Sequence, residues 1–305
     1  MYDVAILTDH RYENPKKIDW YIQQVLTEDN LLKRELELLG LSVIIKDWKS
    51  KNFDWTKTKC AVFRSTWDYF DNFKKFSHWL EKTKSKTQFI NSFDLIKWNL
   101  NKTYLFDLKN NGINIPPSIL IKKNEAISLN ELFQKTCWNE AVIKPVISGA
   151  ARHTYRINKT NFQNHENNFK KLISKEDFLF QEFMNNIVSE GELSLILISG
   201  QYTHAVRKTA KKGDFRVQDD HGGTVEIYHA NKQEIQFAEN CIKHCPKKAH
   251  YARVDIVYDN KNEISLVELE LIEPELWFRN NAKSAKLLAK KISNLVSSKL
   301  EPKLQ

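Results

Sequence analysis

Three carboxylates and one arginine stand close together in the last third of the sequence. Arg253 and Asp255 lie in one predicted strand, and Glu268 and Glu270 lie in the next, thirteen residues after Asp255. Alternate side chains of a strand share a face, so all four can meet at one end of a hairpin. Crowded carboxylates raise one another's pKa unless a cation is bound, and oxygen ligands suit Mg²⁺ or Mn²⁺. The same spacing also fits a solvated polar face with a cross-strand ion pair, and spacing alone leaves both open.

A second feature combines a lysine with a loop of small residues. Lys144 lies near the end of the run Val142–Pro145, and Ser148, Gly149 and two alanines follow. A strand-end ammonium beside free backbone N–H groups can bind phosphate oxygens. The pattern matches neither the P-loop nor Gly-x-Gly-x-x-Gly, and a lone strand-end lysine is usually solvated.

Two further patterns suit a nucleotide. The stretch Phe180–Phe183 offers extended backbone to an adenine edge, and Glu192, which follows it, can accept hydrogen bonds from ribose hydroxyls. Lys208 and Arg216 lie eight residues apart across a glycine-containing loop, which suits a mobile lid over an anionic ligand. An ordinary surface hairpin explains the same two cations.

These motifs occur in the order found in ATP-grasp ligases, and the chain resembles the branch around prokaryotic glutathione synthetase and D-alanine–D-alanine ligase. The motifs that carry the resemblance are Lys102, Val142–Pro145, Gln181–Phe183, Gly191–Glu192, Lys208, Arg216, Gly222–Gly223, Arg253, Asp255, Glu268 and Glu270. Segments 64–69, 213–217 and 268–274 are similar to the glutathione-synthetase-like group that includes the O-ureido-D-serine cyclo-ligase of D-cycloserine formation. Glu270 stands where the superfamily usually has asparagine, although the closer group also has glutamate there.

The resemblance implies ATP as cofactor together with two Mg²⁺ or Mn²⁺ ions. The residues implied to bind the nucleotide are Lys102, Lys144, Ser148, Gly149, Gln181, Glu182, Phe183, Glu192 and Lys208. The implied metal ligands are Asp255, Glu268 and Glu270. In the implied chemistry, Lys208 and Arg216 clamp the transferred phosphate and Arg253 faces the oxyanion of the tetrahedral intermediate. Arg64 and Asp68 are implied to contact the substrate.

The implied activity is that of a carboxylate–amine ligase. ATP phosphorylates a carboxylate, an amine displaces the phosphate, and an amide or ring C–N bond forms on a small amino-acid-like substrate. One alternative is an ATP-grasp ligase that adds amino acids to a protein. Another is a nucleic-acid-binding protein, because 47 basic and 38 acidic residues leave a net charge of +9. The sequence lacks a basic stripe with interleaved aromatics, so we expect small-molecule carboxylate and amine partners and no nucleic acid.

These side chains require a framework of three parts. Residues 1–97 alternate strand and helix patterns, which predicts an open, mainly parallel α/β domain preceding the ATP-grasp part. Residues 98–185 and 186–305 contain strand runs interrupted by helices, which predicts the small lobe and the large C-terminal lobe of a two-lobed ATP-grasp domain. The predicted fold class is therefore α/β followed by α+β.

The remaining composition bears on disulfides, zinc binding and cellular location. Four cysteines in 305 residues are too few for a disulfide scaffold. Cys241 and Cys245 lie one turn apart on a predicted helix without a second ligand pair, which favours buried cysteines over a zinc site. Without a long apolar run or a signal-peptide pattern, we expect a cytoplasmic protein with no membrane contact. The sequence leaves the oligomeric state open, a homodimer included.

Overall fold

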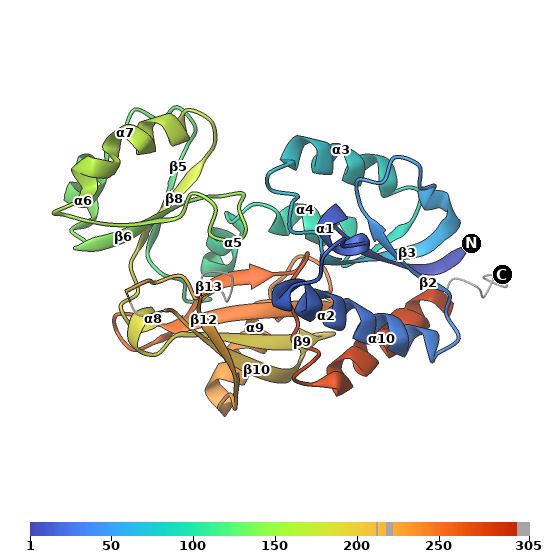
Figure 1. Ribbon diagram of the computed structural model, residues 1–305. Helices are drawn as coiled ribbons and strands as arrows, with labels where there is room; N and C mark the ends of the chain where they lie inside the picture. The colour runs from blue at the N-terminus through green and yellow to red at the C-terminus, as the bar shows by residue number, and fades with distance from the viewer. Residues whose placement is uncertain (212, 218–221, 298–305) are drawn as a thin grey trace.

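The computed structural model describes residues 1–211, 213–217 and 222–297. The described residues form three sheets, each in a separate part of the molecule. Figure 1 shows an N-terminal α/β part in blue and cyan, a small lobe in green, and a large lobe in yellow to orange below them. In the described part of the chain, none of the helices is both long enough and apolar enough to cross a membrane.

The N-terminal sheet is parallel, with strand order β2-β1-β3-β4, as the strand–helix alternation predicted. Both of its faces are covered, which is typical of parallel sheets. Val4 and Ile6 of β1 share a cluster with α2 and α10 (Ala282–Ser297), whereas Ala5 and Leu7 share one with α3. The elements are β1 (Tyr2–Thr8), α1 (His10–Glu13), α2 (Trp20–Glu37), β2 (Val43–Asp47), β3 (Thr58–Ser65), α3 (Phe73–Thr83), β4 (Gln88–Ile90) and α4 (Phe93–Asn99).

The small lobe is an antiparallel sheet, β5-β8-β6-β7, packed against two helices. The sequence patterns did not predict α6 or β7. Helix α6 nevertheless begins at a capping box between Ser128 and Glu131, a signal that is visible in the sequence. The elements of this part are α5 (Tyr104–Asn110), β5 (Ser118–Ile121), α6 (Leu129–Thr136), β6 (Glu140–Pro145), β7 (Tyr155–Asn158), α7 (Phe162–Ile173) and β8 (Phe178–Glu182).

The large lobe is an antiparallel sheet with strand order β11-β10-β9-β12-β13. All seven residues of its central strand β9 are buried, because α5 and α9 cover one face and α10 with the N-terminal sheet covers the other. The elements are α8 (Asn186–Ser189), β9 (Glu192–Ile198), β10 (Gln201–Thr209), β11 (Thr224–Tyr228), α9 (Lys232–Lys243), β12 (Tyr251–Tyr258) and β13 (Ile264–Glu270).

The predicted burial of Cys241 is confirmed. Cys241 is fully buried on α9 in the cluster beneath β9, and burial raises the pKa of its thiol. Cys245, which follows α9, is partly buried against the same cluster. These thiols are therefore packing residues of the large lobe.

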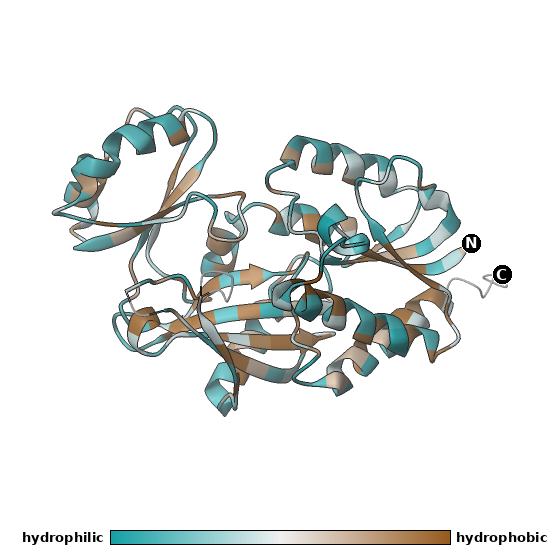
Figure 2. Cartoon of the chain, viewed as in Figure 1, coloured by the Kyte–Doolittle hydropathy of each residue, from teal (hydrophilic) through white to brown (hydrophobic). Residues whose placement is uncertain are grey.

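Helix α10 joins the large lobe to the N-terminal part. Its residues Leu288, Ala289 and Ile292 are fully buried in one cluster with Leu32 and Leu36 of α2. Figure 1 shows the two helices side by side, and Figure 2 shows apolar strands behind their more hydrophilic outer faces. The N-terminal sheet and the large lobe thus share a core, and α10, which the sequence assigns to the segment 186–305, also completes the N-terminal part.

This shared core gives a stability prediction. Leu288→Ala should lower the free energy of unfolding by about 2–5 kcal/mol, because it leaves a cavity where the two parts meet. Urea unfolding followed by fluorescence measures the change. Lys290→Ala removes an exposed side chain of the same helix and is the matched control. Equal unfolding midpoints for the two variants would contradict the shared core.

Candidate active site

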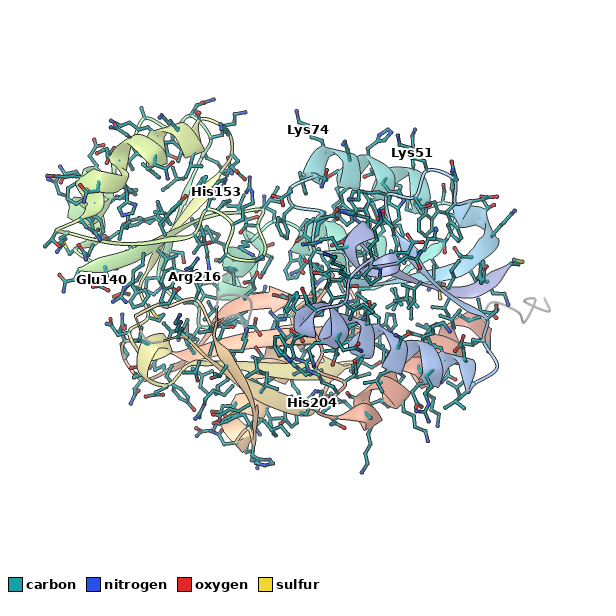
Figure 3. All side chains as sticks on the ribbon, viewed as in Figure 1. Lys51, Lys74, Glu140, His153, His204 and Arg216 are labelled. Carbon is teal, nitrogen blue, oxygen red and sulfur yellow. The ribbon has the colours of Figure 1, made fainter. Side chains whose placement is uncertain are left out.

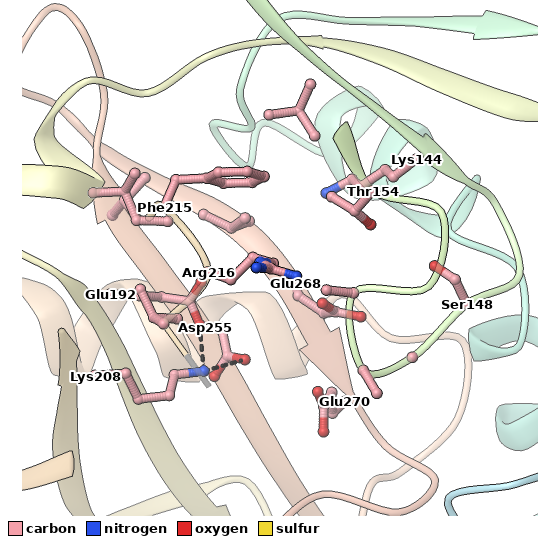
Figure 4. A pocket seen from close by; sticks show the side chains of 18 of the residues that line it. Lys144, Ser148, Thr154, Glu192, Lys208, Phe215, Arg216, Asp255, Glu268 and Glu270 are labelled. Atoms are coloured by element: carbon pink, nitrogen blue, oxygen red, sulfur yellow. Dashed lines mark hydrogen bonds and ion pairs between the residues drawn. The ribbon is translucent and has the colours of Figure 1, made fainter. Parts of the chain in front are cut away.

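A single pocket lies where the three parts of the chain meet. Fourteen residues predicted for nucleotide, metal or chemistry line it: Lys102, Lys144, Ser148, Gly149, Gln181, Glu182, Phe183, Glu192, Lys208, Arg216, Arg253, Asp255, Glu268 and Glu270. Figure 4 shows Lys144 and Ser148 on one side of the pocket and Glu192, Lys208 and Asp255 on the other. The small lobe and the large lobe therefore face each other across it.

The register of β12 and β13 brings the four charged residues of the hairpin together. Arg253 lies opposite Glu270, and Asp255 lies opposite Glu268. The predicted convergence of these side chains is therefore confirmed. The alternative, a solvated face with a cross-strand ion pair, is right about the ion pair, which joins Arg253 to Glu270. Arg253 and Asp255 are only 9% and 1% exposed, however, and the face forms a pocket wall rather than an open surface.

Asp255 is the most firmly held carboxylate of the pocket. It accepts two hydrogen bonds of 2.9 Å from Arg253, one of 3.2 Å from Lys208 and one of 2.6 Å from Ser194. Burial alone would raise its pKa, but Arg253 and Lys208 outweigh burial and hold the pKa of Asp255 well below its usual range. Asp255 therefore stays ionised between its two cations.

Three further carboxylates of the pocket also have cationic partners. Glu268 pairs with Lys102, Glu270 with Arg253, and Glu192 with Lys208. Burial, assisted by the neighbouring Glu268 and Asp255, raises the pKa of Glu270 to about 7 despite Arg253. Burial likewise raises the pKa of Glu192. The large-lobe side of the pocket is thus a compact set of alternating charges.

Lys144 differs from these cations. It is 8% exposed, and no hydrogen bond or ion pair joins its ammonium group to another residue within the described ranges. Burial, with Lys102 nearby, lowers its pKa to about 8, although Glu268 and Glu192 oppose this shift. A buried ammonium without a partner is costly unless a ligand supplies an anion. Lys144 is therefore placed to meet an anionic ligand in the pocket.

The loop after β6 forms the wall beside Lys144. Ala150, Ala151 and His153 have positive φ angles of 47°, 53° and 50°, which are uncommon for residues other than glycine. A Cβ atom at Gly149 would lie 2.6 Å from the Phe70 ring, so only glycine fits there without movement of that ring. The loop is therefore held against the N-terminal part, and Figure 3 shows His153 on the side of the small lobe that faces it.

The residues predicted to hold adenosine form a mixed polar and apolar wall. Gln181 donates to the Ser118 hydroxyl at 2.9 Å, and the Phe183 ring lies 3.9 Å beneath the Arg156 guanidinium. Apolar side chains complete this wall, and of these only Val142 belongs to a motif named from the sequence; the others are Met184, Ile187, Val257 and Val267. Apolar residues of this kind are present throughout the core, so no local signal separates them from packing residues.

Arg216 lines the pocket from the loop after β10. Its guanidinium pairs with Asp214 at 2.6 Å, and Figure 3 shows it where the small lobe meets the large lobe. Residues 218–221 of the predicted lid, which include His221, lie outside the described residues.

Arg64 and Asp68 do not line the pocket. Arg64 is 3% exposed and donates to the Pro274 carbonyl at 2.8 Å. Asp68 accepts from Trp48 Nε1 at 2.7 Å and pairs with Lys49. The end of β3 is enclosed by neighbouring segments, so these side chains contact protein rather than the pocket.

The pocket has a further wall that the motif analysis did not assign. It consists of Tyr21 and Trp67 from the N-terminal part and of Glu273, Glu275 and Trp277 from the segment after β13. Trp67 and Glu273 belong to segments 64–69 and 268–274, which carry the resemblance to the cyclo-ligase group, although the resemblance gave them no role. Tyr21, Glu275 and Trp277 have no local signal beyond their aromatic or acidic character, which is common elsewhere in the sequence.

The donor set suits a hard cation. Asp255, Glu268 and Glu270 supply only carboxylate oxygens, which Mg²⁺ prefers. No group of three or more His, Cys, Asp and Glu side chains among residues 1–211, 213–217 and 222–297 forms a ready-made metal site. Mg²⁺ is commonly bound through one or two carboxylates together with substrate phosphates. The residues present therefore fit a cation that binds with ATP.

Comparisons with known proteins agree with this geometry. Residues 4–91 match the N-terminal domain of the D-cycloserine synthetase DcsG, and residues 105–270 match the ATP-grasp domain of prokaryotic glutathione synthetase. The cycloserine biosynthesis protein DcsG of Streptomyces lavendulae is 24% identical over 253 residues, which cover 78% of this chain and 83% of that protein.

Solved structures show the same fold. The crystal structure of D-cycloserine synthetase DcsG aligns with a TM-score of 0.85 at 20% identity, covering 96% of this chain and 99% of that one. D-alanine–D-alanine ligase from Bacillus anthracis aligns with a TM-score of 0.63 at 13% identity, covering 98% and 97%. The predicted fold class, an N-terminal α/β domain followed by an ATP-grasp domain, is confirmed.

The chain therefore belongs to the prokaryotic glutathione synthetase ATP-grasp family. It is an ATP-grasp ligase, an enzyme that uses ATP to form carbon–nitrogen bonds.

Lys144 gives a binding prediction. Lys144→Ala should weaken the binding of an ATP analogue at least about tenfold, the loss of roughly one charge-assisted contact. Calorimetric titration measures the dissociation constant. Lys135→Ala, an exposed lysine on α6 of the same lobe, is the control. Unchanged affinity in a folded Lys144→Ala variant would remove Lys144 from the phosphate site.

The lowered pKa of Lys144 also predicts a pH dependence. The ammonium loses its proton as the pH rises through about 8, so wild-type affinity for the ATP analogue should fall between about pH 7 and about pH 9. An arginine keeps its charge over this range. Lys144→Arg should therefore show a flatter profile, and parallel profiles would contradict the assignment.

Proposed function

We propose that this chain is an ATP- and Mg²⁺-dependent carboxylate–amine ligase that works through an acyl phosphate on a small amino-acid-like substrate. The observation that carries the proposal is the position of Lys144. Its buried ammonium lacks a partner within the described residues and faces the Lys208–Asp255–Arg253 cluster across one pocket. An anion that spans the two sides of the pocket, such as a nucleoside triphosphate, would pair with Lys144 on one side and with the cations of the Lys208–Asp255–Arg253 cluster on the other.

The chain's own residues supply positioning and charge. Lys102 and Lys144 hold phosphate oxygens, while Lys208 and Arg216 neutralise the phosphoryl group as it moves to the substrate carboxylate. Arg253 faces the oxyanion that forms when the amine attacks the acyl phosphate. Mg²⁺, held through Asp255, Glu268 and Glu270, supplies further charge neutralisation when it is bound. Enclosure of the pocket excludes water, which would hydrolyse the acyl phosphate.

The ring-forming version of this reaction has the stronger support. Both the N-terminal match at residues 4–91 and the full-length structural similarity are to a D-cycloserine synthetase. The amine and the carboxylate then belong to one molecule, as in O-ureido-D-serine, and one pocket holds both. The ATP-grasp ligase PsnB, whose structure contains a minimal precursor, aligns with a TM-score of only 0.63. A protein substrate is therefore the second candidate.

The function is tested by incubating the enzyme with ATP, Mg²⁺ and a panel of amino acids, dipeptides and O-ureido-serine enantiomers. Phosphate release that depends on one compound, together with a cyclic product lighter by one water than that compound, would support ring closure. With O-ureido-serine the carbamoyl group also leaves, as CO₂ and NH₃ with uptake of one water, and the expected product is the free cycloserine ring. A product that joins two compounds would support intermolecular ligation. Phosphate release only with an added polypeptide would favour the protein-modifying alternative, and no release with any compound would contradict the proposal.

Glu270 gives a prediction about the metal. Glu270→Asn keeps an oxygen ligand and removes a charge, so the half-saturating Mg²⁺ concentration at fixed ATP should rise several-fold while turnover survives. Glu263→Gln changes a charge on an exposed turn and is the control. If Glu270→Asn needs no more Mg²⁺ than wild type, Glu270 is not a ligand and the metal would be held by Asp255 and Glu268.

A further inference from the structure

The wall formed by the segment after β13 and the N-terminal part defines a separate end of the pocket. Trp67 Nε1 donates to the Glu273 carbonyl at 2.9 Å, and the Tyr21 and Trp67 rings lie 6.3 Å apart. Trp277 closes this end toward the large lobe, where the Arg253 guanidinium lies 5.2 Å from its ring centre. The pocket lysines Lys102, Lys144 and Lys208 come from the two ATP-grasp lobes instead.

The carboxylate of Glu273 lacks a cationic partner at this end. Glu270 pairs with Arg253, and Glu275 pairs with Arg279 at 2.5 Å. Within the described ranges no ion pair involves Glu273, whose hydrogen-bond partner is the Tyr69 hydroxyl. Burial, with Glu270 nearby, raises the pKa of Glu273 to about 8. A cationic ligand group beside Glu273 would favour the ionised form of this carboxyl and pair with it.

The aromatic walls suit the same kind of ligand. Ring faces of tryptophan and tyrosine attract ammonium groups. Trp277 is 1% exposed with a φ of 45°, and its buried Nε1–H has no acceptor among the residues that the structure describes. A non-glycine residue in this backbone region persists only where its surroundings hold it there, often at ligand sites.

Buried charges hold the segment in place from the N-terminal part. Arg64 donates to the Pro274 carbonyl at 2.8 Å. Glu28, 2% exposed, accepts from the backbone N–H groups of Phe278 at 2.9 Å and Arg279 at 3.0 Å. The segment that carries Glu273 and Trp277 is thus fixed on both sides before any ligand binds. Preformed geometry of this kind lowers the entropy lost on binding.

From these contacts we infer that Glu273, walled by Tyr21, Trp67 and Trp277, binds the α-ammonium group of the substrate, which is a different nitrogen from the one that attacks the acyl phosphate. This inference rests on the proposed function, since it names the substrate class of the same pocket. The ligand would extend from the phosphate-binding lysines, where its carboxylate is activated, to the acidic and aromatic end. Arg64 and Glu28 are positioning residues for this end, because they act through the backbone of the segment.

The test compares each amino acid of the panel with its N-acetyl derivative, which lacks the positive charge. Wild type should lose at least about tenfold in kcat/KM on acetylation, the value of one charge-assisted contact. Glu273→Gln should raise the KM of the free amino compound by a similar factor while the KM of ATP and the Mg²⁺ requirement stay unchanged. Glu263→Gln, on an exposed turn, is the matched control.

Two results would overturn the inference. One is an equal effect of Glu273→Gln on the amino and acetylated compounds, which indicates a structural role. The other is a raised Mg²⁺ requirement, which indicates a metal ligand. If no compound is turned over, the proposed function is contradicted, but the inference about Glu273 can still be tested. Calorimetry in the presence of a non-hydrolysable ATP analogue then measures the binding of each amino compound and of its N-acetyl derivative. A preference for the amino compound that Glu273→Gln abolishes would support the subsite, whereas equal or absent binding would overturn it.

Discussion

The pairing register of β12 and β13 is the constraint on which the pocket depends. It places Arg253 opposite Glu270 and Asp255 opposite Glu268, so two strands present one guanidinium and three carboxylates on a single face. On the other face, Val254 and Leu269 pack in the core with α5 and α9. If one strand slipped by one residue, its charged side chains would move to the apolar face and be buried in that core. The apolar residues therefore enforce the arrangement of the charged ones.

The N-terminal part imposes a second constraint on the pocket. The nucleotide side consists of residues from the two ATP-grasp lobes, whereas the acidic and aromatic end depends on Tyr21, Trp67 and the buried charges of Glu28 and Arg64. Helix α10 packs with α2 in the core shared with the large lobe, so this end is held rigidly against the ATP-grasp sheet. The proposed phosphate site and the inferred substrate site thus rest on different structural elements.

Much of the fold and of the candidate site could be predicted from the sequence, because the patterns that determine them are local. Strand alternation places Arg253 with Asp255, and Glu268 with Glu270, on one face of their own strands. Their pairing across the hairpin depends on a register shift between Asp255 and Ile256, which neither the alternation nor the turn predicts. The position of Arg64 could not be predicted in the same way. A strand-end arginine has the same local pattern whether it contacts a ligand or a carbonyl, and here the carbonyl belongs to Pro274, 210 residues away. The acidic and aromatic end depends on long-range contacts of the same kind.

Because the proposed phosphate side and the acidic and aromatic end come from different elements, one pair of lobes can serve different substrates. The D-alanine–D-alanine ligase shares the fold over 98% of this chain yet aligns with a TM-score of 0.63, against 0.85 for the D-cycloserine synthetase. Charges that hold phosphates must converge from both lobes, so their strands and register are constrained by the chemistry. The proposed substrate end is built from the N-terminal part and the segment after β13, so it can change in shape and charge without moving Lys144, Lys208 or Asp255. Under the proposed function, substrate choice would then depend on how the N-terminal part holds the segment after β13.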